Sequence, residues 1–302
     1  MIEIKNLIKV YGDKMVLSNI SFTAPDGHIT GFVGPNGAGK STTMRMVACL
    51  ENPDRGTALV DRIPYSEAEN PGRVMGVYLG QGYLPMHMTG TEYLTYVCSL
   101  AGMGAGRVGK LLEMVELTDA ANKKIKSYSL GMKQRAGIAA ALAGDPTTLM
   151  LDEPVNGLDP MGVQWLRGVL REQAKAGKSV LLSSHLLSEL ELVADRVVML
   201  DHGHVVSQGE MVALERGNEP HVVVRTSDDG AFVQLLRDKE IEFHMLDESE
   251  GLSIKDLPAR EVGRLAYENG LLVDHLEEKR SSLEEVFMAT ATAGEGKETS
   301  HA

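Results

Sequence analysis

The sequence has few cysteines and no long apolar run. Only two of its 302 residues are cysteines, Cys49 and Cys98. Both have apolar neighbours, so we expect two buried thiols in a reducing compartment rather than a disulfide or a metal-binding pair. No apolar run reaches the roughly 18–20 residues that a membrane-spanning helix needs, and Glu3 and Lys5 interrupt any signal-peptide core. These absences predict a cytosolic chain that reaches a membrane only through a partner.

The sequence is also short of positive charge. Its 30 Lys and Arg face 42 Asp and Glu, a formal net charge of −12, which argues against direct binding of nucleic acid. The deficit is local, because residues 1–217 carry 21 basic and 23 acidic side chains whereas residues 218–302 carry 9 and 19. A chain of this length can bury a full core, and we expect two domains.

One stretch fits the phosphate-binding pattern G-x-x-x-x-G-K-[ST] at every constrained position. It reads Gly34, Pro35, Asn36, Gly37, Ala38, Gly39, Lys40, Ser41, Thr42. The apolar run 29–33 predicts a buried strand before it and residues 41–50 predict a helix after it, which is the context that the motif requires. We expect backbone N–H groups to bind phosphates, Lys40 to reach the β- and γ-phosphates, and the Ser41 hydroxyl to contact Mg²⁺. The chain is therefore predicted to bind a nucleotide triphosphate.

A second apolar strand, predicted over residues 148–153, ends in two carboxylates. Asp152 is expected to bind Mg²⁺ from the side opposite Ser41, and Glu153 to orient or deprotonate the water that attacks the γ-phosphate. Two acids at a strand end often form only a solvated turn, but the phosphate loop and a shared metal favour catalysis. A neighbouring strand, predicted over residues 178–184, ends at His185, which is expected to contact the γ-phosphate or that water.

Three further positions carry weaker signals, and each has a structural alternative. Tyr11 follows a predicted strand, where its ring can stack on adenine or be a half-buried strand-end residue. Gln81, at the end of a predicted strand, can reach a metal's water shell or the attacking water, or can be a turn residue. Ser129 begins a predicted helix, where helix capping and a second anion site are equally supported.

The rest of the first 217 residues predicts an α/β fold. An antiparallel opening is expected from strands 2–10 and 16–22, with a turn at Gly12 and Asp13. Residues from about 90 to 140 have helical spacing interrupted by glycines, which predicts a helical subdomain. The other expected elements are strands 57–60 and 76–81, helices 161–176 and 186–194, and a hairpin over residues 196–207.

The C-terminal part predicts a small α/β domain over residues 218–289. Residues 217–220 are interpreted as a linker. The domain is expected to contain strands 221–225 and 271–275 and helices 231–238, 258–269 and 282–288. Residues 290–302 are small and polar and are expected to be disordered.

The order of these motifs resembles that of the nucleotide-binding subunit of ATP-binding cassette (ABC) transporters, over about residues 1–215. In this resemblance Tyr11 is the adenine-stacking aromatic, residues 34–42 are the Walker A loop and Gln81 is the Q-loop glutamine. Residues 149–153 match Walker B, Gly157 to Asp159 the D-loop, and His185 the switch histidine. Residues 128–134 match the signature motif, which separates this family from other phosphate-loop ATPases.

The signature motif departs from the family pattern. The usual Leu-Ser-Gly-Gly-Gln reads Tyr128-Ser129-Leu130-Gly131-Met132 here, which keeps the serine and the second glycine that contact the γ-phosphate. The run from Ser129 to Arg135 is similar to that of bacterial ABC-2 type export ATPases for drugs, antibiotics or peptides.

The resemblance implies a phosphate-loop NTPase core of ABC type with an antiparallel β subdomain, a helical subdomain and a small C-terminal α/β accessory domain. It also implies ATP, with Mg²⁺ contacted by Ser41, Gln81 and Asp152, and a head-to-tail homodimer in which Ser129 and Gly131 serve the partner's ATP. Asp159 is then part of the nucleotide site.

The implied function is ATP hydrolysis that drives export through a separate integral membrane permease, to which the chain is peripherally attached at the cytoplasmic face. A soluble ABC ATPase acting on ribosomes or DNA is disfavoured, because the chain has one cassette, no heptad run and a negative net charge. An importer ATPase is a nearer alternative. The C-terminal domain is interpreted as a dimer brace, with regulation as the alternative.

Overall fold

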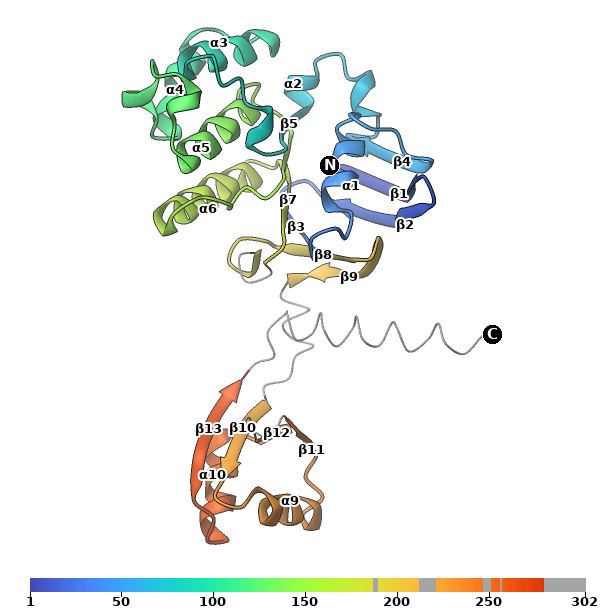
Figure 1. The fold of residues 1–302 in the computed structure, drawn as a ribbon, viewed down its shortest axis with the longest axis vertical. Coiled ribbons are helices and arrows are strands. Elements are labelled where there is room, and N and C mark those ends of the chain that lie inside the picture. Colours follow the sequence, from blue (N-terminus) through green and yellow to red (C-terminus); the bar gives the residue numbers. More distant parts are fainter. Residues whose placement is uncertain (187–189, 212–220, 247–250, 256, 280–302) are drawn as a thin grey trace. The chain divides into compact units, whose positions relative to one another are not determined.

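The computed structural model of the protein describes residues 1–186, 190–211, 221–246, 251–255 and 257–279. The chain divides into two compact units, Met1–Met211 and Val212–Ala302 (Figure 1). The expected linker 217–220, helix 282–288 and tail 290–302 lie outside the described residues, as does part of the expected helix 186–194.

A six-stranded sheet forms the centre of the first unit (Figure 1). Its five neighbouring parallel strands place their carboxyl ends at one edge, and the last strand pairs antiparallel with the fifth. Strands β3, β6 and β7 are buried at every residue, as expected for parallel strands with both faces covered. In order the strands are β5 (Met75–Tyr78), β6 (Thr148–Leu151), β7 (Ser179–Ser184), β3 (Ile29–Val33), β8 (Arg196–Asp201) and β9 (His204–Glu210).

A three-stranded antiparallel sheet packs beside the central sheet, as the N-terminal alternation predicts. Its order is β2 (Lys14–Ala24), β1 (Ile2–Tyr11) and β4 (Arg55–Val60). Helix α1 (Lys40–Val47) contributes Met44 to the apolar core between the two sheets. Phe22 and Phe32, one from each sheet, meet there with ring centroids 5.0 Å apart. This core fixes the start of α1 against both sheets.

Helices gather on the other side of the central sheet (Figure 1). The expected helical subdomain is confirmed. It consists of α3 (Gly90–Leu100), α4 (Gly106–Met114) and α5 (Leu130–Ala141). Helix α6 (Pro160–Lys175) packs against β3 and β7, and the short α2 (Pro71–Val74) precedes β5.

One tryptophan ties three of these helices together. The Trp165 Nε1 of α6 donates a hydrogen bond of 2.8 Å to the main-chain oxygen of Met114 in α4, and the Arg135 guanidinium of α5 lies 4.7 Å from the centre of the indole.

Within the described part of the chain, no helix has the length and apolar content to cross a membrane.

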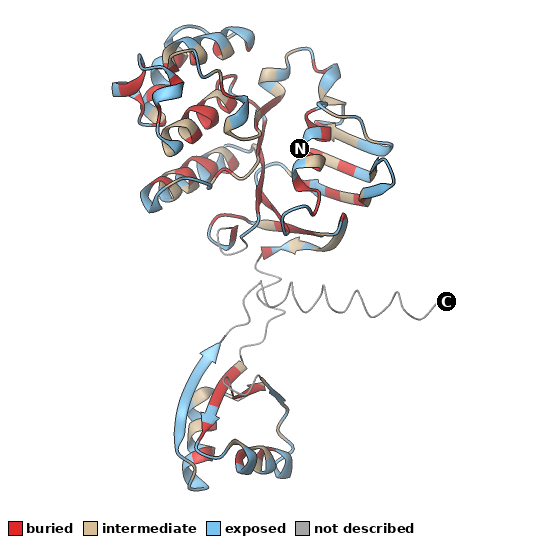
Figure 2. Cartoon of the chain, viewed as in Figure 1, coloured by how far each residue is buried: buried red, intermediate tan, exposed pale blue. Residues whose placement is uncertain are grey.

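Over its described residues, the second unit forms a four-stranded antiparallel sheet with two helices. Its apolar core joins Val222 and Val224 of the sheet to Phe232 and Leu236 of one helix and Val262 of the other. Figure 2 shows that β13 is exposed along its whole length. The strand order is β11 (Phe243–Met245), β12 (Leu252–Lys255), β10 (His221–Thr226) and β13 (Val273–Lys279); the helices are α9 (Asp229–Asp238) and α10 (Ala259–Glu268).

Several sequence expectations are wrong in detail. The helix expected to residue 50 ends at Val47, and Cys49 then turns away with a φ of 54° and is exposed. Only Cys98 is buried, so the expectation of two buried thiols is wrong. The strand expected over 76–81 ends at Tyr78, and Gln81 begins a 3₁₀ turn (Gln81–Tyr83). The expectation also missed both short strands β11 and β12.

Candidate nucleotide site

The phosphate loop joins β3 to α1, and its glycines are required by its geometry. Gly37 and Gly39 have φ values of 86° and 106°, a region that other residues rarely adopt. A Cβ on Gly34 would lie 2.1 Å from the main-chain oxygen of Leu200 in β8. Because α1 begins directly after Gly39, its first N–H groups and the hydroxyls of its first turn border the loop.

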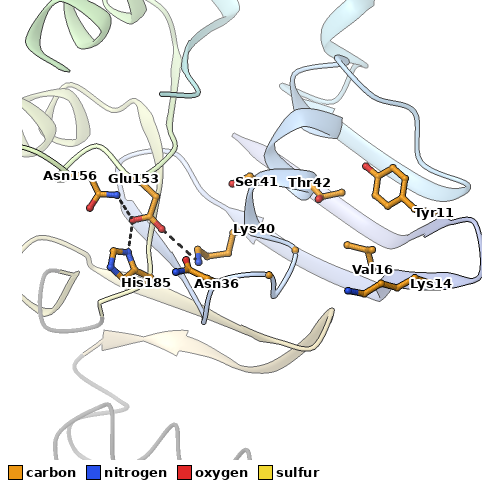
Figure 3. A pocket seen from close by; sticks show the side chains of 12 residues that line it. Tyr11, Lys14, Val16, Asn36, Lys40, Ser41, Thr42, Glu153, Asn156 and His185 are labelled. Atoms are coloured by element: carbon orange, nitrogen blue, oxygen red, sulfur yellow. Dashed lines mark hydrogen bonds and ion pairs between the residues drawn. The ribbon is translucent and has the colours of Figure 1, made fainter. Parts of the chain in front are cut away.

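A pocket of about 470 Å³ lies over this loop. Figure 3 shows Glu153 and His185 at one end, Tyr11 at the other, and Lys40 between them. The pocket therefore offers a buried cation and loop N–H groups for phosphates, and an aromatic ring for a base. Its lining residues are Tyr11, Lys14, Val16, Asn36, Gly37, Gly39, Lys40, Ser41, Thr42, Glu153, Asn156 and His185.

The Lys40 side chain is buried, and the phosphate loop fixes its position through hydrogen bonds. Its Nζ donates hydrogen bonds to the main-chain oxygens of Gly34, at 2.6 Å, and Pro35, at 3.3 Å. The same Nζ lies 3.7 Å from Oε1 of Glu153. The loop thus places the ammonium group within ion-pair distance of the carboxylate at the end of β6.

The carboxylate of Glu153 is oriented by two neighbours. Its Oε2 lies 2.9 Å from Nδ1 of His185 and accepts a 3.3 Å hydrogen bond from Nδ2 of Asn156. These contacts occupy Oε2 and turn Oε1 toward Lys40 (Figure 3). Oε2 is thus held by hydrogen bonds, and Oε1 faces the Lys40 ammonium at the end of the pocket.

The backbone of Glu153 is also constrained. Its φ of 48° is left-handed, which a residue with a side chain adopts only when its surroundings impose it. Its N–H donates to the Ser183 hydroxyl at 2.8 Å, and its main-chain oxygen accepts from Nε2 of Gln134 at 3.1 Å. Ser183 in turn donates to Oδ1 of Asp152, so one buried hydroxyl positions both carboxylate residues.

The oxygen donors near the loop fit Mg²⁺, which binds one or two protein oxygens together with phosphate oxygens and waters. The hydroxyl of Ser41 lines the pocket, and Asp152 directly follows β6 and accepts a hydrogen bond from the Ser183 hydroxyl. Among the described residues, no cluster of three or more His, Cys, Asp or Glu could ligate a metal.

Gln81 does not line the pocket. Its Nε2 donates to Oε1 of Gln134 at 3.2 Å and to the main-chain oxygen of Leu130 at 3.4 Å, both in α5. Its expected contact with a metal's water shell stays a prediction.

The signature and D-loop residues also lie outside the pocket of their own chain. Ser129 is confirmed as the N-cap of α5, since its hydroxyl accepts from the N–H of Met132 at 3.2 Å. Asp159 caps α6 in the same way, through the N–H of Gly162 at 2.8 Å. A Cβ on Gly131 would lie 3.3 Å from the main-chain oxygen of Gly157, so the first turn of α5 lies close to the loop that contains Gly157.

The ring of Tyr11 forms the far end of the pocket. Its hydroxyl donates to the carboxylate of Glu51, and that hydrogen bond raises the pKa of Tyr11. The Lys9 Nζ lies 5.3 Å from the ring centroid. The ring is thereby anchored by its hydroxyl while 44% of the residue remains exposed.

Sequence reasoning missed five residues of this site. Lys14 and Val16 line the pocket from β2, and Asn156 from the loop after β6, whereas Ser183 and Gln134 act behind it. Asn156 lies in the loop that the motif order had marked. Gln134 ends the run 128–134 that matches the signature motif, but nothing in that run marks it as a neighbour of Glu153. Lys14, Val16 and Ser183 carry no local signal, because they are ordinary residues in a strand.

The fold and the pocket define a phosphate-loop ATPase. A family model described as "ABC transporter" matches residues 17–156, and one described as a domain of unknown function (DUF8746) matches residues 220–284. The bacitracin transport ATP-binding protein BcrA of Enterococcus faecalis is 35% identical, with 95% of each chain covered. The daunorubicin/doxorubicin resistance ATP-binding protein DrrA of Streptomyces peucetius is 34% identical, with 95% of this chain and 91% of that protein covered.

Solved structures agree with this result. The dimeric bacterial ABC transporter cassette MJ0796 superposes with a TM-score of 0.63 at 26% identity, over 70% of this chain and 99% of that chain. The chain belongs to the ABC transporter ATP-binding proteins, and it is an ATPase that binds ATP. The expected family, fold class and enzyme class are confirmed.

Proposed function

We propose that this chain is the ATP-hydrolysing subunit of an exporter whose substrate crosses the membrane through a separate integral permease. The observation that carries this proposal is end-to-end similarity to BcrA and DrrA, which are named for bacitracin transport and for resistance to daunorubicin and doxorubicin. The cargo is then a drug, an antibiotic, a peptide or a lipid-like molecule. The chain works at the cytoplasmic face of the cell membrane, attached through the permease.

The pocket supports a division of roles along the nucleotide. Tyr11 stacks on the adenine, while residues 34–42 and the Lys40 ammonium neutralise the phosphates. Glu153 orients the attacking water and takes its proton on Oε1, because Oε2 is occupied by His185 and Asn156. Ser41 and Asp152 would bind Mg²⁺, which neutralises charge on the phosphate oxygens when bound.

Hydrolysis needs residues that the pocket of one chain lacks. Ser129, Gly131 and Asp159 do not line it, although two of them begin helices whose first N–H groups suit an anion. The MJ0796 cassette is dimeric. We propose that two copies of this chain join head to tail, so that Ser129 and Gly131 contact the γ-phosphate bound by the partner and Asp159 completes the shared site.

The test is affinity purification of the tagged chain from detergent-solubilised cells, followed by mass spectrometry. We expect a protein with several membrane spans in stoichiometric amount. If ribosomal proteins or nucleic acid take its place, the transport proposal fails and the ATPase acts on another machine. If an extracytoplasmic solute-binding protein accompanies the permease, the direction is import.

A further inference from the structure

Gln134 lies behind the nucleotide pocket, where α5 meets the central sheet. Only 2% of its surface is exposed, and it is one of the few buried polar residues of the first unit. A buried amide is stable only when its donor and acceptor groups are satisfied. Gln134 satisfies them with three partners that belong to three different segments: Tyr78, Gln81 and Glu153.

The first contact reaches the backbone of Glu153. Nε2 of Gln134 donates to the main-chain oxygen of Glu153 at 3.1 Å, while Ser183 accepts from its N–H on the other side. The left-handed conformation of Glu153 persists because both of its backbone polar groups are engaged. One of these two contacts comes from the sheet and the other from α5.

The other contacts fix the orientation of the Gln134 amide. Its Oε1 accepts from the Tyr78 hydroxyl at 2.6 Å and from Nε2 of Gln81 at 3.2 Å. Burial raises the pKa of Tyr78, so this hydroxyl stays protonated and donates. With two donors at Oε1, the amide directs Nε2 toward Glu153. Gln81 also donates to the main-chain oxygen of Leu130, at the start of α5.

We propose that Gln134 is a positioning residue that connects Gln81 and the start of α5 to the backbone conformation of Glu153. A displacement of α5 or of the Gln81 segment relative to β6 breaks the hydrogen bond to Glu153. The Glu153 backbone then relaxes, and its carboxylate leaves His185. Hydrolysis therefore depends on the position of the helices, even though Gln134 contacts no nucleotide. The inference rests on the proposed catalytic role of Glu153.

The experiment compares kcat and KM for ATP in the full-length chain and its Gln134→Met variant. Methionine keeps the size of the side chain and removes all three hydrogen bonds. We expect kcat to fall about tenfold, the order of effect of a lost buried hydrogen bond. KM for ATP should stay within about twofold, because Gln134 does not line the pocket.

The matched control is Ser179→Ala. Ser179 is also buried, and its hydroxyl donates to the main-chain oxygen of Ala24 at 2.9 Å, at the end of β7 away from the pocket. It should lower the melting temperature as Gln134→Met does, without changing kcat. Equal effects of both variants on kcat would show that Gln134 is only structural and would overturn the proposal.

Two further variants separate the possible failures. If Gln81 acts through Gln134, then Gln81→Ala should lower kcat by a smaller factor in Gln134→Met than in the wild-type background; strictly additive losses would overturn the link. Glu153→Gln is measured in parallel. Wild-type turnover in Glu153→Gln would refute the role of Glu153. Loss of turnover in Glu153→Gln together with a normal kcat in Gln134→Met would refute only the positioning role of Gln134. If Gln134→Met does not fold, Tyr78→Phe removes one contact and should lower kcat about threefold at constant KM.

Discussion

Adding one methyl group to the phosphate loop at Gly34 should destabilise the first unit, because Gly34 lies against the main chain of Leu200. In Gly34→Ala the new Cβ would lie 2.1 Å from the main-chain oxygen and 3.1 Å from the carbonyl carbon of Leu200. No flexible side chain can move aside, since both segments are backbone at neighbouring strands β3 and β8. The strands must separate by about 1 Å to restore a normal contact, which is a case of overpacking.

The expected cost is about 3 kcal/mol of unfolding free energy, the upper part of the usual range for overpacking. For a unit of this size, that lowers the melting temperature by roughly 6–12 °C. The shift also moves the Gly34 carbonyl that accepts from Lys40 at 2.6 Å. ATP affinity should therefore fall together with stability.

Thermal melting followed by tryptophan fluorescence measures this effect. Trp165 is the only tryptophan of the sequence and belongs to the first unit, so its signal reports that unit alone. Gly168→Ala is the matched control, because Gly168 lies within α6 with no neighbouring atom within 4 Å of an added Cβ. It should raise stability by about 1 kcal/mol. Melting of Gly34→Ala within 2 °C or so of wild type, with normal ATP binding, would refute the reasoning.

Three further predictions test the site and its surroundings. Gly157→Ala should destabilise, because Gly157 has a φ of 83° and its Cβ would lie 2.4 Å from Cδ2 of Leu130; adding Leu130→Ala should recover about 1 kcal/mol of unfolding free energy in urea titrations, and strict additivity would contradict the contact. Tyr11→Ala should weaken ATP binding about tenfold, since it removes the ring that we propose to stack on the base, whereas Tyr11→Phe should bind almost normally; equal losses in fluorescence titrations would mean that the hydroxyl matters instead. The hydrogen bond from Lys178 lowers the pKa of Asp145, so this carboxylate stabilises the fold above its unfolded pKa near 4 and loses that contribution as the pH falls further. Asp145→Asn should therefore be less stable at pH 7 by under about 1 kcal/mol, because Asp145 is largely exposed, and equal to wild type in acid; a gap that widens in acid would reverse the assigned sign.

The phosphate loop was predictable because its chemistry is local. Nine consecutive residues determine the backbone conformations, the cation and the hydroxyl, and the flanking apolar runs show the strand and the helix. Asp152, Glu153 and His185 were predictable for a related reason, since parallel strands place their carboxyl ends at one edge of a sheet.

Ser183 and Gln134 were not predictable from the sequence, because their roles arise from contacts between distant segments. Ser183 forms hydrogen bonds with Asp152 and Glu153 only because β7 pairs with β6. The burial of Cys49 was predicted wrongly because its sequence neighbours are apolar. In the structure α1 ends two residues earlier, and the left-handed φ of Cys49 itself places the residue at the surface. The short strand β12 lacks enough residues for a clear alternation.

The most direct test of the central claim is ATP turnover and molecular mass of Glu153→Gln, measured beside the wild-type chain. The substitution keeps the shape of the side chain, whose Oε2 contacts His185 and Asn156 in the wild type, but removes the proposed general base. We expect normal ATP binding, loss of hydrolysis, and accumulation of an ATP-bound dimer in light scattering. Wild-type turnover in Glu153→Gln would contradict the account.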